Sequence, residues 1–424
     1  MTLSITPAKT GGSIPAIASK SEAHRLLILS AFADKPCRIR CEELNDDISA
    51  TVGCLCAMGA TIVRDGSYFH ITPIASPVKQ PLLDCKESGS TLRFLVPVAA
   101  MLGLDASFLM AGRLPERPLS PLREELERCG ATLSETGTNP LLCKGRLQKT
   151  EFSIPANVSS QFISGLLFAL AVSGQSGSVE LIGRQESVPY VDMTLDALAL
   201  FGIRAEREGS TILIRENRGI VAPDELRVGG DWSGAAFPLC LGAVGASPVT
   251  VEGLDPHTRQ GDRAVLDALR LFGADVVERE DRVTVSPAPL HGIDLDASQI
   301  PDLVPVLAVV AAGAVGTTVI SGAARLRIKE SDRLMAVRQM INVLGGEVIE
   351  TSDGLIVHGT GALTGGSVSS HGDHRIAMSA AVASVLCREE ILLEGAESVS
   401  KSYPRFWQDA KILGMKLTES GKEN

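Results

Sequence analysis

Basic residues stand at the starts of several segments that are otherwise strongly apolar. The stretch "SKSEAHR", residues 19–25, leads directly into "LLILSAFA", so that Lys20 and Arg25 lie in the first turns of an expected buried helix. A cation at a helix N-terminus faces the positive end of the helix dipole, which costs roughly 0.3–1 kcal/mol. The same end presents free N–H groups that bind anions. Cations placed there favour a site for a strongly anionic small molecule, or for two of them.

This arrangement recurs along the chain. The expected buried helices open with "SKSEAHR", "ESGSTLR", "NVSSQF", "GDWSG", "SQIPD" and "HGDHR", which are rich in residues that cap helices. We expect Asp231 and Ser233 to act as caps only. The basic residues among and near these starts are Lys20, Arg25, Arg93, Arg117, Arg325, Lys329, Arg333, Arg375 and Lys401.

A sixfold repeat supplies these helices. The stretches "LCAMGATIV", "LERCGATLS", "LALFGIRAE", "LRLFGADVV", "INVLGGEVI" and "AKILGMKLT" share a central glycine at positions 59, 130, 202, 273, 345 and 414. Each glycine is predicted to end a helix in the left-handed conformation. An apolar helix and a short strand precede this helix, and a hairpin follows it in most copies. The repeating unit is therefore helix, strand, helix, hairpin.

The repeat predicts an α/β fold of unusual arrangement. A helix that is apolar all round must be surrounded by protein, whereas an alternating hairpin can keep one face in water. We therefore expect two inside-out α/β domains of three repeats each, with buried helices and outer sheets. One domain is placed at residues 20–228, and the other at 1–19 plus 229–424, closed by an N-terminal strand at 3–17. Parallel buried helices present their N-termini on one side, so we expect anions to bind in the cleft between the domains.

Composition argues against several kinds of partner. The chain has 424 residues and a net charge of −10, which disfavours nucleic acid. No secretory signal is visible at the N-terminus. The uncharged span 303–324 is interrupted by Pro305 and "GAVGTT", so we expect a buried helix and a strand there rather than a membrane segment. Nine cysteines without a CxxC pair indicate reduced thiols. We expect a cytoplasmic monomer.

Other chemistries find little support in the sequence. It contains no GxxxxGK[ST] phosphate loop and no GxSxG nucleophile elbow. "HGDH" offers His371, Asp373 and His374, but a third, distant ligand is missing. We therefore expect neither a metal nor a cofactor.

Eight short motifs together carry a resemblance to a known family. "SKSEAHR", "ESGSTLR", "ERP" (116–118), "SSQF", "IPD", "KESDR" (329–333), "GDHR" and "SKSYP" follow one another in the order and approximate spacing of the 5-enolpyruvylshikimate-3-phosphate synthases. The resemblance spans the whole chain and includes the sixfold repeat, which this family folds into two inside-out α/β domains.

The resemblance implies an activity that suits the expected anion site. Members of this family transfer the enolpyruvyl group of phosphoenolpyruvate to the 5-hydroxyl of shikimate 3-phosphate and release phosphate, in the pathway to chorismate and aromatic amino acids. Both substrates carry a phosphate and a carboxylate. The reaction breaks a C–O bond rather than a P–O bond, so the metal clamp of phosphoryl transfer is not required. We expect the domains to close about residues 18–20 and 227–231 when an anionic ligand neutralises cations from both halves. The resemblance also implies inhibition by glyphosate close to Gly89.

Family motifs assign the site residues by resemblance. The expected shikimate 3-phosphate contacts are Lys20, Ser21, Arg25, Ser159, Ser160, Gln161, Ser187, Tyr190, Asp302 and Lys329. The expected phosphoenolpyruvate contacts are Lys20, Gly89, Arg117, Gln161, Arg333, Arg375 and Lys401. The matching catalytic residues are Asp302 and Glu330, with Lys20 as a rival proton donor.

The implied mechanism is addition followed by elimination through a tetrahedral intermediate. A base takes the 5-hydroxyl proton, while an acid protonates the methylene carbon of phosphoenolpyruvate. Asp302 among cations should stay ionised as a base. Glu330 lies between Lys329 and Arg333, so burial must offset their charges if Glu330 is to act as an acid.

Two departures from the family pattern and two rival functions remain. Glu87 and Arg325 stand where many members have Asn, and both are left out of the site.

The related transferase that acts on UDP-N-acetylglucosamine carries a Cys in the loop before its Arg-Pro, but no Cys lies between Cys85 and Cys129 here. A non-catalytic anion-binding protein on the same scaffold would have no need of both Asp302 and Glu330.

Overall fold

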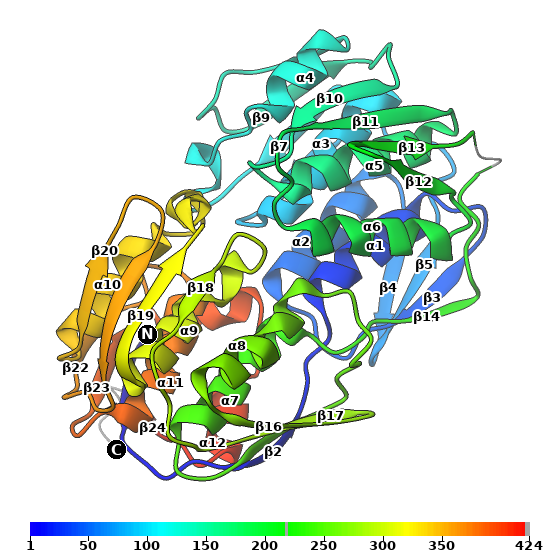
Figure 1. Ribbon diagram of the computed structural model, residues 1–424. Helices are drawn as coiled ribbons and strands as arrows, with labels where there is room; N and C mark the ends of the chain where they lie inside the picture. The colour runs from blue at the N-terminus through cyan, green and yellow to red at the C-terminus, as the bar shows by residue number, and fades with distance from the viewer. Residues whose placement is uncertain (217–218, 420–424) are drawn as a thin grey trace. The chain divides into compact units, whose positions relative to one another are not determined.

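The chain forms two compact units in a computed structural model that describes residues 1–216 and 219–419. Unit 1 comprises residues 1–19 and 229–424, and unit 2 comprises residues 20–228. Each unit is built from three copies of one structural repeat. Figure 1 shows the helices of each unit together with the strands that cover them.

Three buried helices form the centre of each unit. They are α1 (Lys20–Ala31), α3 (Gly89–Leu102) and α5 (Ser160–Ser173) in unit 2. In unit 1 they are α7 (Trp232–Val244), α9 (Val304–Gly313) and α11 (His374–Ala383). In α9 every residue from 304 to 312 is buried, which fits an apolar sequence without a polar stripe. The expected helix within residues 303–324 is thereby confirmed, and β19 (Val315–Ser321) supplies the strand after it.

A second, more exposed helix follows in each repeat. These helices are α2 (Asp46–Met58), α4 (Leu122–Arg128), α6 (Val188–Leu200), α8 (Val265–Phe272), α10 (Arg333–Val343) and α12 (Phe406–Ile412). The repeat glycine lies at or one residue after the C-cap of each, and all six glycines have a positive φ, from 75° to 117°. The predicted left-handed helix ends are confirmed.

Four-stranded sheets cover the helices of unit 2. Their strand orders are β14-β3-β5-β4, β6-β7-β9-β8 and β10-β11-β13-β12. The strands are β3 (Cys37–Arg40), β4 (Thr61–Asp65), β5 (Tyr68–Thr72), β6 (Leu82–Asp84), β7 (Ala106–Leu109), β8 (Ala131–Leu133), β9 (Leu141–Gly145), β10 (Glu151–Pro155), β11 (Gly177–Ile182), β12 (Ala205–Glu208), β13 (Thr211–Ile214) and β14 (Glu225–Arg227). Each sheet is mixed, with one parallel pair, such as β10 beside β11, and an antiparallel hairpin.

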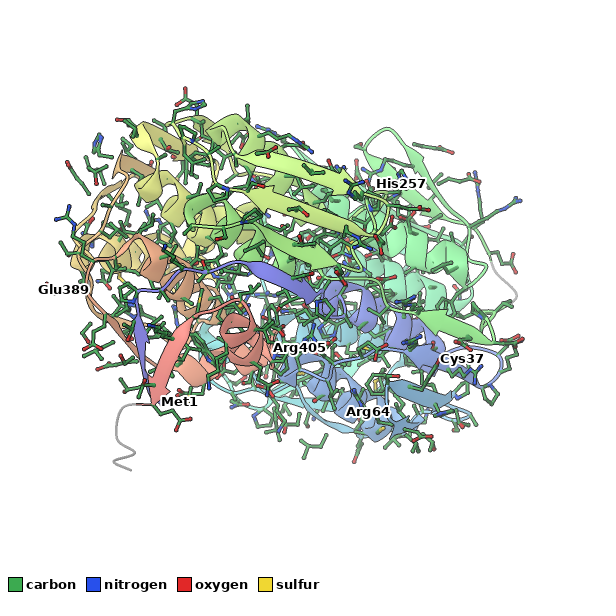
Figure 2. All side chains as sticks on the ribbon, turned by 90° about the horizontal axis from the view of Figure 1, so that it is seen from below. Met1, Cys37, Arg64, His257, Glu389 and Arg405 are labelled. Atoms are coloured by element: carbon green, nitrogen blue, oxygen red, sulfur yellow. The ribbon has the colours of Figure 1, made fainter. Side chains whose placement is uncertain are left out.

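Unit 1 repeats this plan. Its sheets have the orders β16-β17-β15-β2, β18-β19-β21-β20 and β22-β23-β1-β24. Besides β19, the strands are β1 (Thr2–Thr6), β2 (Gly12–Pro15), β15 (Val249–Glu252), β16 (Asp275–Arg279), β17 (Arg282–Ser286), β18 (Asp294–Asp296), β20 (Glu347–Glu350), β21 (Leu355–Thr360), β22 (Gly366–Ser369), β23 (Ile391–Glu394) and β24 (Lys416–Glu419). Arg405, labelled in Figure 2, donates to the carbonyl of Pro15 over 2.6 Å and so ties the start of α12 to β2.

Two details of the sequence-based prediction are wrong. The repeat begins with a short parallel edge strand before its buried helix, as in β6, β10, β18 and β22, which the pattern of helix, strand, helix, hairpin omitted. These strands span only three to five residues, too few to show periodicity. The expected strand at 3–17 is two strands in different sheets, because β1 ends before Pro7 and β2 begins only at Gly12.

The expected α/β architecture, with helices inside and sheets outside, is confirmed by the burial of both parts. The strands alternate buried and exposed residues, as in β5 and β17, so one face of each sheet packs on the helices and the other faces water. No helix within the described residues is long and apolar enough to cross a membrane.

Candidate active site

Lys20 is the first residue of α1, where the sequence predicted a cation at a buried helix start. Its Nζ lies 2.9 Å from Oδ2 of Asp47, and the two side chains are only 17% and 6% exposed. Asp47 belongs to the first turn of α2, whose N-terminus also favours a negative charge. The cation of Lys20 is therefore compensated within unit 2.

Arg25 connects α1 to α6. It donates from Nη1 to the carbonyl of Ser21 over 2.5 Å, from Nη2 to the carbonyl of Tyr190 over 2.8 Å, and from Nε to Oγ1 of Thr194 over 2.9 Å. Burial lowers the pKa of Arg25 to about 10, which leaves it charged at neutral pH. The structure thus brings Ser21, Arg25 and Tyr190 together at one end of the paired helices.

Ser187 caps α6 in a conformation that non-glycine residues rarely adopt. It has φ 52° and ψ 42°, and its side chain is buried. A left-handed residue of this type costs of order 1–3 kcal/mol and persists where the surroundings fix it, often at binding sites. The strain is consistent with the expected role of Ser187 at the start of α6.

The starts of α3 and α5 form a second cluster in unit 2. Gln161 accepts from Nη1 of Arg93 over 2.8 Å and donates to Oγ of Ser90 over 2.9 Å. Ser159 is the N-cap of α5, and its side chain accepts from the backbone N–H of Gln161 over 3.3 Å. Ser160 begins the helix itself. These contacts place Gln161 beside the first turn of α3.

Gly89 is the first residue of α3 and lies close to the guanidinium groups of Arg117 and Arg93. A Cβ added at Gly89 would lie 3.0 Å from Nη1 of Arg117 and 3.1 Å from Nη1 of Arg93. A methyl group there would push at least one of these cations away from its present position. Arg117, which follows the 3₁₀ turn η1 (Leu114–Glu116), therefore lies beside Gly89, and both are predicted contacts of phosphoenolpyruvate.

Arg333 is the centre of the charged cluster in unit 1. It donates from Nη1 to Oδ1 of Asp302 over 2.8 Å and from Nη2 to Oε2 of Glu330 over 2.7 Å. Its Nε and Nη2 also contact the two oxygens of Asp373, at 2.7 and 3.2 Å. Burial acts to lower the pKa of Arg333, but the charges of Asp373 and Glu330 outweigh it and raise that pKa above its usual value. The guanidinium thus holds both expected catalytic carboxylates.

Asp302, in the 3₁₀ turn η3 (Pro301–Leu303), faces two further cations. Nζ of Lys329 lies 3.5 Å from Oδ1 and Nη2 of Arg375 lies 3.5 Å from Oδ2, while Nη1 of Arg375 donates to the Asp302 carbonyl over 2.9 Å. Burial acts to raise the pKa of Asp302. The charges of Arg375, Lys329 and Arg333 outweigh burial and hold that pKa well below its usual value. Asp302 is therefore ionised at neutral pH, as expected from the sequence.

Lys401 is the last residue of the 3₁₀ helix η6 (Ala396–Lys401) and is 6% exposed. The helix η6 packs against α11, which begins with His374 and Arg375. Glu330 and Lys329 follow the 3₁₀ helix η4 (Ala324–Ile328). The charged residues of unit 1 therefore come from five separate parts of the chain, which are η3, the segment after η4, α10, α11 and η6. Arg325, which was left out of the site, donates to the carbonyl of Ser298 over 2.7 Å.

Comparison with known proteins decides the family. The sequence profile of EPSP synthase (3-phosphoshikimate 1-carboxyvinyltransferase) matches residues 6–410. The 3-phosphoshikimate 1-carboxyvinyltransferase of Clostridium kluyveri is 40% identical over 419 residues, covering 98% of each chain. The chain belongs to the EPSP synthase family.

A solved EPSP synthase agrees with this assignment. The enzyme from Acinetobacter baumannii superposes with a TM-score of 0.81 at 26% identity, covering 99% of this chain and 100% of that one. The EPSP synthase fold and the expected family are therefore confirmed across the full length.

Sequence reasoning missed two carboxylates that pair with the predicted cations. The sequence predicted cations whose charge only an anionic ligand would neutralise. In the structure Lys20 is paired with Asp47. Arg333 is paired with Asp373 and also with the two predicted catalytic carboxylates, Asp302 and Glu330. A buried cation without a partner would carry a large desolvation penalty, which internal carboxylates offset. Asp47 gave a weak signal as part of "NDD" at a helix start. Asp373 was noted only as a metal ligand.

The possible metal site at "HGDH" is not formed. Asp373 is fully buried, caps α11 through the backbone N–H of Arg375, and accepts from Oγ of Ser331. Among residues 1–216 and 219–419, no group of three or more His, Cys, Asp or Glu side chains could hold a metal ion.

Proposed function

We propose that this chain transfers the enolpyruvyl group of phosphoenolpyruvate to the 5-hydroxyl of shikimate 3-phosphate by addition and elimination through a tetrahedral intermediate. The overall activity is that of a 3-phosphoshikimate 1-carboxyvinyltransferase, a transferase of the shikimate pathway that serves aromatic amino acid biosynthesis. The assignment of roles to single residues, set out below, is our own.

The observation that carries the proposal is the contact of one buried guanidinium with two carboxylates. Arg333 holds Asp302 at 2.8 Å and Glu330 at 2.7 Å, and these side chains are 19% and 14% exposed. Addition and elimination require one group that accepts a proton and one that donates it, placed close together and partly shielded from water. Two carboxylates on one cation meet that requirement.

We assign Asp302 as the base. Its three cationic neighbours keep it ionised, so it is ready to accept the proton of the 5-hydroxyl. Glu330 is assigned as the acid that protonates the methylene carbon of phosphoenolpyruvate. Lys20 remains the rival donor, and its contact with Asp47 keeps the ammonium group in place.

Arg333 is also a predicted contact of phosphoenolpyruvate, but its hydrogen-bond donors already have partners. Its donors are taken up by Asp302, Glu330 and Asp373. We propose that the carboxylate of phosphoenolpyruvate replaces Glu330 on Nη2, which would loosen the hold on Glu330 and favour its protonated form. Arg375 and Lys401 would bind the same substrate, together with Lys20, Gly89, Arg117 and Gln161.

Shikimate 3-phosphate is assigned mainly to the helix starts of unit 2. Ser21, Arg25, Ser187 and Tyr190 lie where α1 meets α6, and Ser159 and Ser160 begin α5 beside Gln161. Hydroxyl groups, the N–H groups of helix starts and a fixed guanidinium suit a phosphate. Lys20, Asp302 and Lys329 complete the proposed set.

We also propose that the protein acts as a cytoplasmic monomer. All nine cysteines are free thiols and eight of them are buried, which suits a reducing compartment. Light scattering during gel filtration would test the monomer.

Phosphate release tests the proposed function. The enzyme should release phosphate when both substrates are present, and neither substrate alone should support release. Replacing shikimate 3-phosphate by UDP-N-acetylglucosamine should abolish it. Release from phosphoenolpyruvate alone, or with the sugar nucleotide, would contradict the assignment.

A further inference from the structure

Arg375 is held by a serine from another buried helix of unit 1. Its Nη2 donates to Oγ of Ser233 over 2.6 Å, while its Nη1 donates to the carbonyl of Asp302 over 2.9 Å. Ser233 is the second residue of α7, and the sequence predicted that it only caps that helix. The predicted cap Asp231 is confirmed, since it accepts from the backbone N–H groups of Ser233 and Gly234, but Ser233 lies inside the helix and does not cap it. The hydroxyl of Ser233 is thus available for another purpose.

The chemistry of the two groups fixes the direction of this contact. A guanidinium can only donate, so Oγ of Ser233 must be the acceptor. The single hydrogen of the hydroxyl then points to a different group. The turn that carries Asp262 packs against α7, and hydrogen bonding from Ser233 acts to lower the pKa of Asp262, which is the effect of a hydroxyl that donates to a carboxylate. The order of donation is therefore Arg375 to Ser233 to Asp262.

Asp262 is well placed to anchor this chain of hydrogen bonds. It is 1% exposed and lies in the 3₁₀ turn η2 (Gly261–Ala264). The residue before this turn, Gln260, accepts from the backbone N–H of Trp232 over 3.0 Å and donates to the carbonyl of Gly230 over 2.7 Å. These contacts fasten the turn to the start of α7. Burial raises the pKa of Asp262, and the charge of Arg375 opposes that rise.

We propose that Ser233 and Asp262 are positioning residues that fix the guanidinium of Arg375 for phosphoenolpyruvate, an inference that rests on the proposed role of Arg375. One edge of the guanidinium is held through Nη1 by the Asp302 carbonyl, and the Ser233 hydroxyl fixes the adjacent Nη2. With both contacts made, the planar group has one orientation before substrate arrives. A preorganised cation binds without first losing side-chain freedom.

The central experiment compares Ser233→Ala with Ser233→Thr. The Ala variant should raise KM for phosphoenolpyruvate by roughly 10- to 150-fold, the range of a lost hydrogen bond to a charged group. Its kcat and its KM for shikimate 3-phosphate should change by less than about twofold, because Arg333 and Lys329 still hold Asp302 and the substitution removes no residue assigned to shikimate 3-phosphate. Ser233→Thr keeps the hydroxyl and should restore most of the affinity. An Ala variant with an unchanged KM for phosphoenolpyruvate would overturn the inference.

A double variant tests whether Asp262 acts through Ser233. Asp262→Asn alone should raise the same KM, and adding it to Ser233→Ala should raise KM by less than the product of the two single effects, because the connecting hydroxyl is already missing. Independent, fully multiplied effects would contradict the relay. Asp267→Asn, a change of the same kind on the exposed face of α8, is the matched control and should leave KM unchanged. If Asp262→Asn is too unstable to purify, the Ser233 pair still decides the inference.

Arg375→Ala separates this inference from the proposed function. A large rise in KM for phosphoenolpyruvate with Arg375→Ala, but none with Ser233→Ala, would overturn the positioning role alone. An unchanged KM with Arg375→Ala would overturn the assignment of Arg375 and with it the positioning role, while phosphate release from the two substrates would still stand.

Discussion

Arg333 donates to Asp302 over 2.8 Å inside unit 1, and the arginine side chain is only 2% exposed. The contact joins a residue of α10 to one of η3, 31 residues earlier in the chain. The same guanidinium reaches Glu330 and Asp373. The two proposed proton-transfer groups, Asp302 and Glu330, therefore contact the same fixed guanidinium.

Neutral isosteres of the two carboxylates should separate chemistry from binding. Asp302→Asn and Glu330→Gln keep the size of each side chain but remove the group that exchanges a proton. Each should lower kcat by about 10²- to 10⁴-fold, the usual contribution of general acid–base catalysis, with a much smaller change in KM for phosphoenolpyruvate. Steady-state kinetics would measure this. Near-normal turnover in both variants would show that the catalytic assignment is wrong.

Cations outside this cluster should act through substrate affinity. Arg117→Ala and Lys401→Ala each remove a charge assigned to phosphoenolpyruvate, so KM for that substrate should rise by roughly 10- to 100-fold while kcat changes little. Arg113→Ala is the matched control, because Arg113 is 49% exposed and pairs with Glu116 at the surface. A loss confined to kcat would argue that these residues serve the chemistry instead.

Gly89 should govern inhibition by glyphosate. We expect this inhibitor in the phosphoenolpyruvate site near Gly89, as the family resemblance implies, and a methyl group there would stand 3.0 Å from Nη1 of Arg117. Crowding a filled site costs typically 1–3 kcal/mol, so Gly89→Ala should weaken glyphosate by about 10- to 100-fold and phosphoenolpyruvate by less. The ratio of inhibition constant to KM, measured for both proteins, checks this. Equal losses for inhibitor and substrate would contradict the steric argument.

His24 should make stability depend on pH below neutrality. It is completely buried in α1, with Nδ1 2.7 Å from Oγ1 of Thr51, and burial lowers its pKa from 6.5 to about 3. The unfolded chain therefore binds a proton at this residue between these values while the folded chain does not. The stability contributed by neutral His24 is fully present above the unfolded pKa. It is lost progressively as the pH is lowered from the unfolded pKa toward the folded one.

A comparison with His24→Asn isolates this effect, since other groups titrate alike in both proteins. Between about pH 7.5 and about pH 5, the free energy of unfolding of the parent should fall by about 2 kcal/mol more than that of the variant. Urea denaturation at the two pH values would measure it. Parallel changes in the two proteins would show that His24 is not held neutral.

The repeated elements could be predicted because their signals are local. The glycine of "LCAMGATIV" marks a helix end within a few residues, and the left-handed φ of Gly59 is 117°. The buried character of α9 can likewise be read from its own composition. Short edge strands such as β6 carry no such signal, because their pairing depends on strands that lie elsewhere in the sequence.

The contacts within the site were harder to predict, because they join distant segments. Motifs named Lys20 and Arg333, but Asp47 lies 27 residues from the former and Asp373 lies 40 from the latter. Ser233 was expected to cap a helix, yet its hydroxyl contacts Arg375, 142 residues away. Which carboxylate or hydroxyl meets a given cation is decided by how the buried helices pack, and the sequence pattern leaves that open.

The isotope content of the released phosphate tests the reaction most directly. Phosphoenolpyruvate labelled with ¹⁸O at the bridging oxygen would be turned over with shikimate 3-phosphate, and the phosphate examined by mass spectrometry. Addition and elimination break the C–O bond, so the account predicts that the label leaves with phosphate. Phosphate without the label would mean cleavage of the P–O bond and would contradict enolpyruvyl transfer.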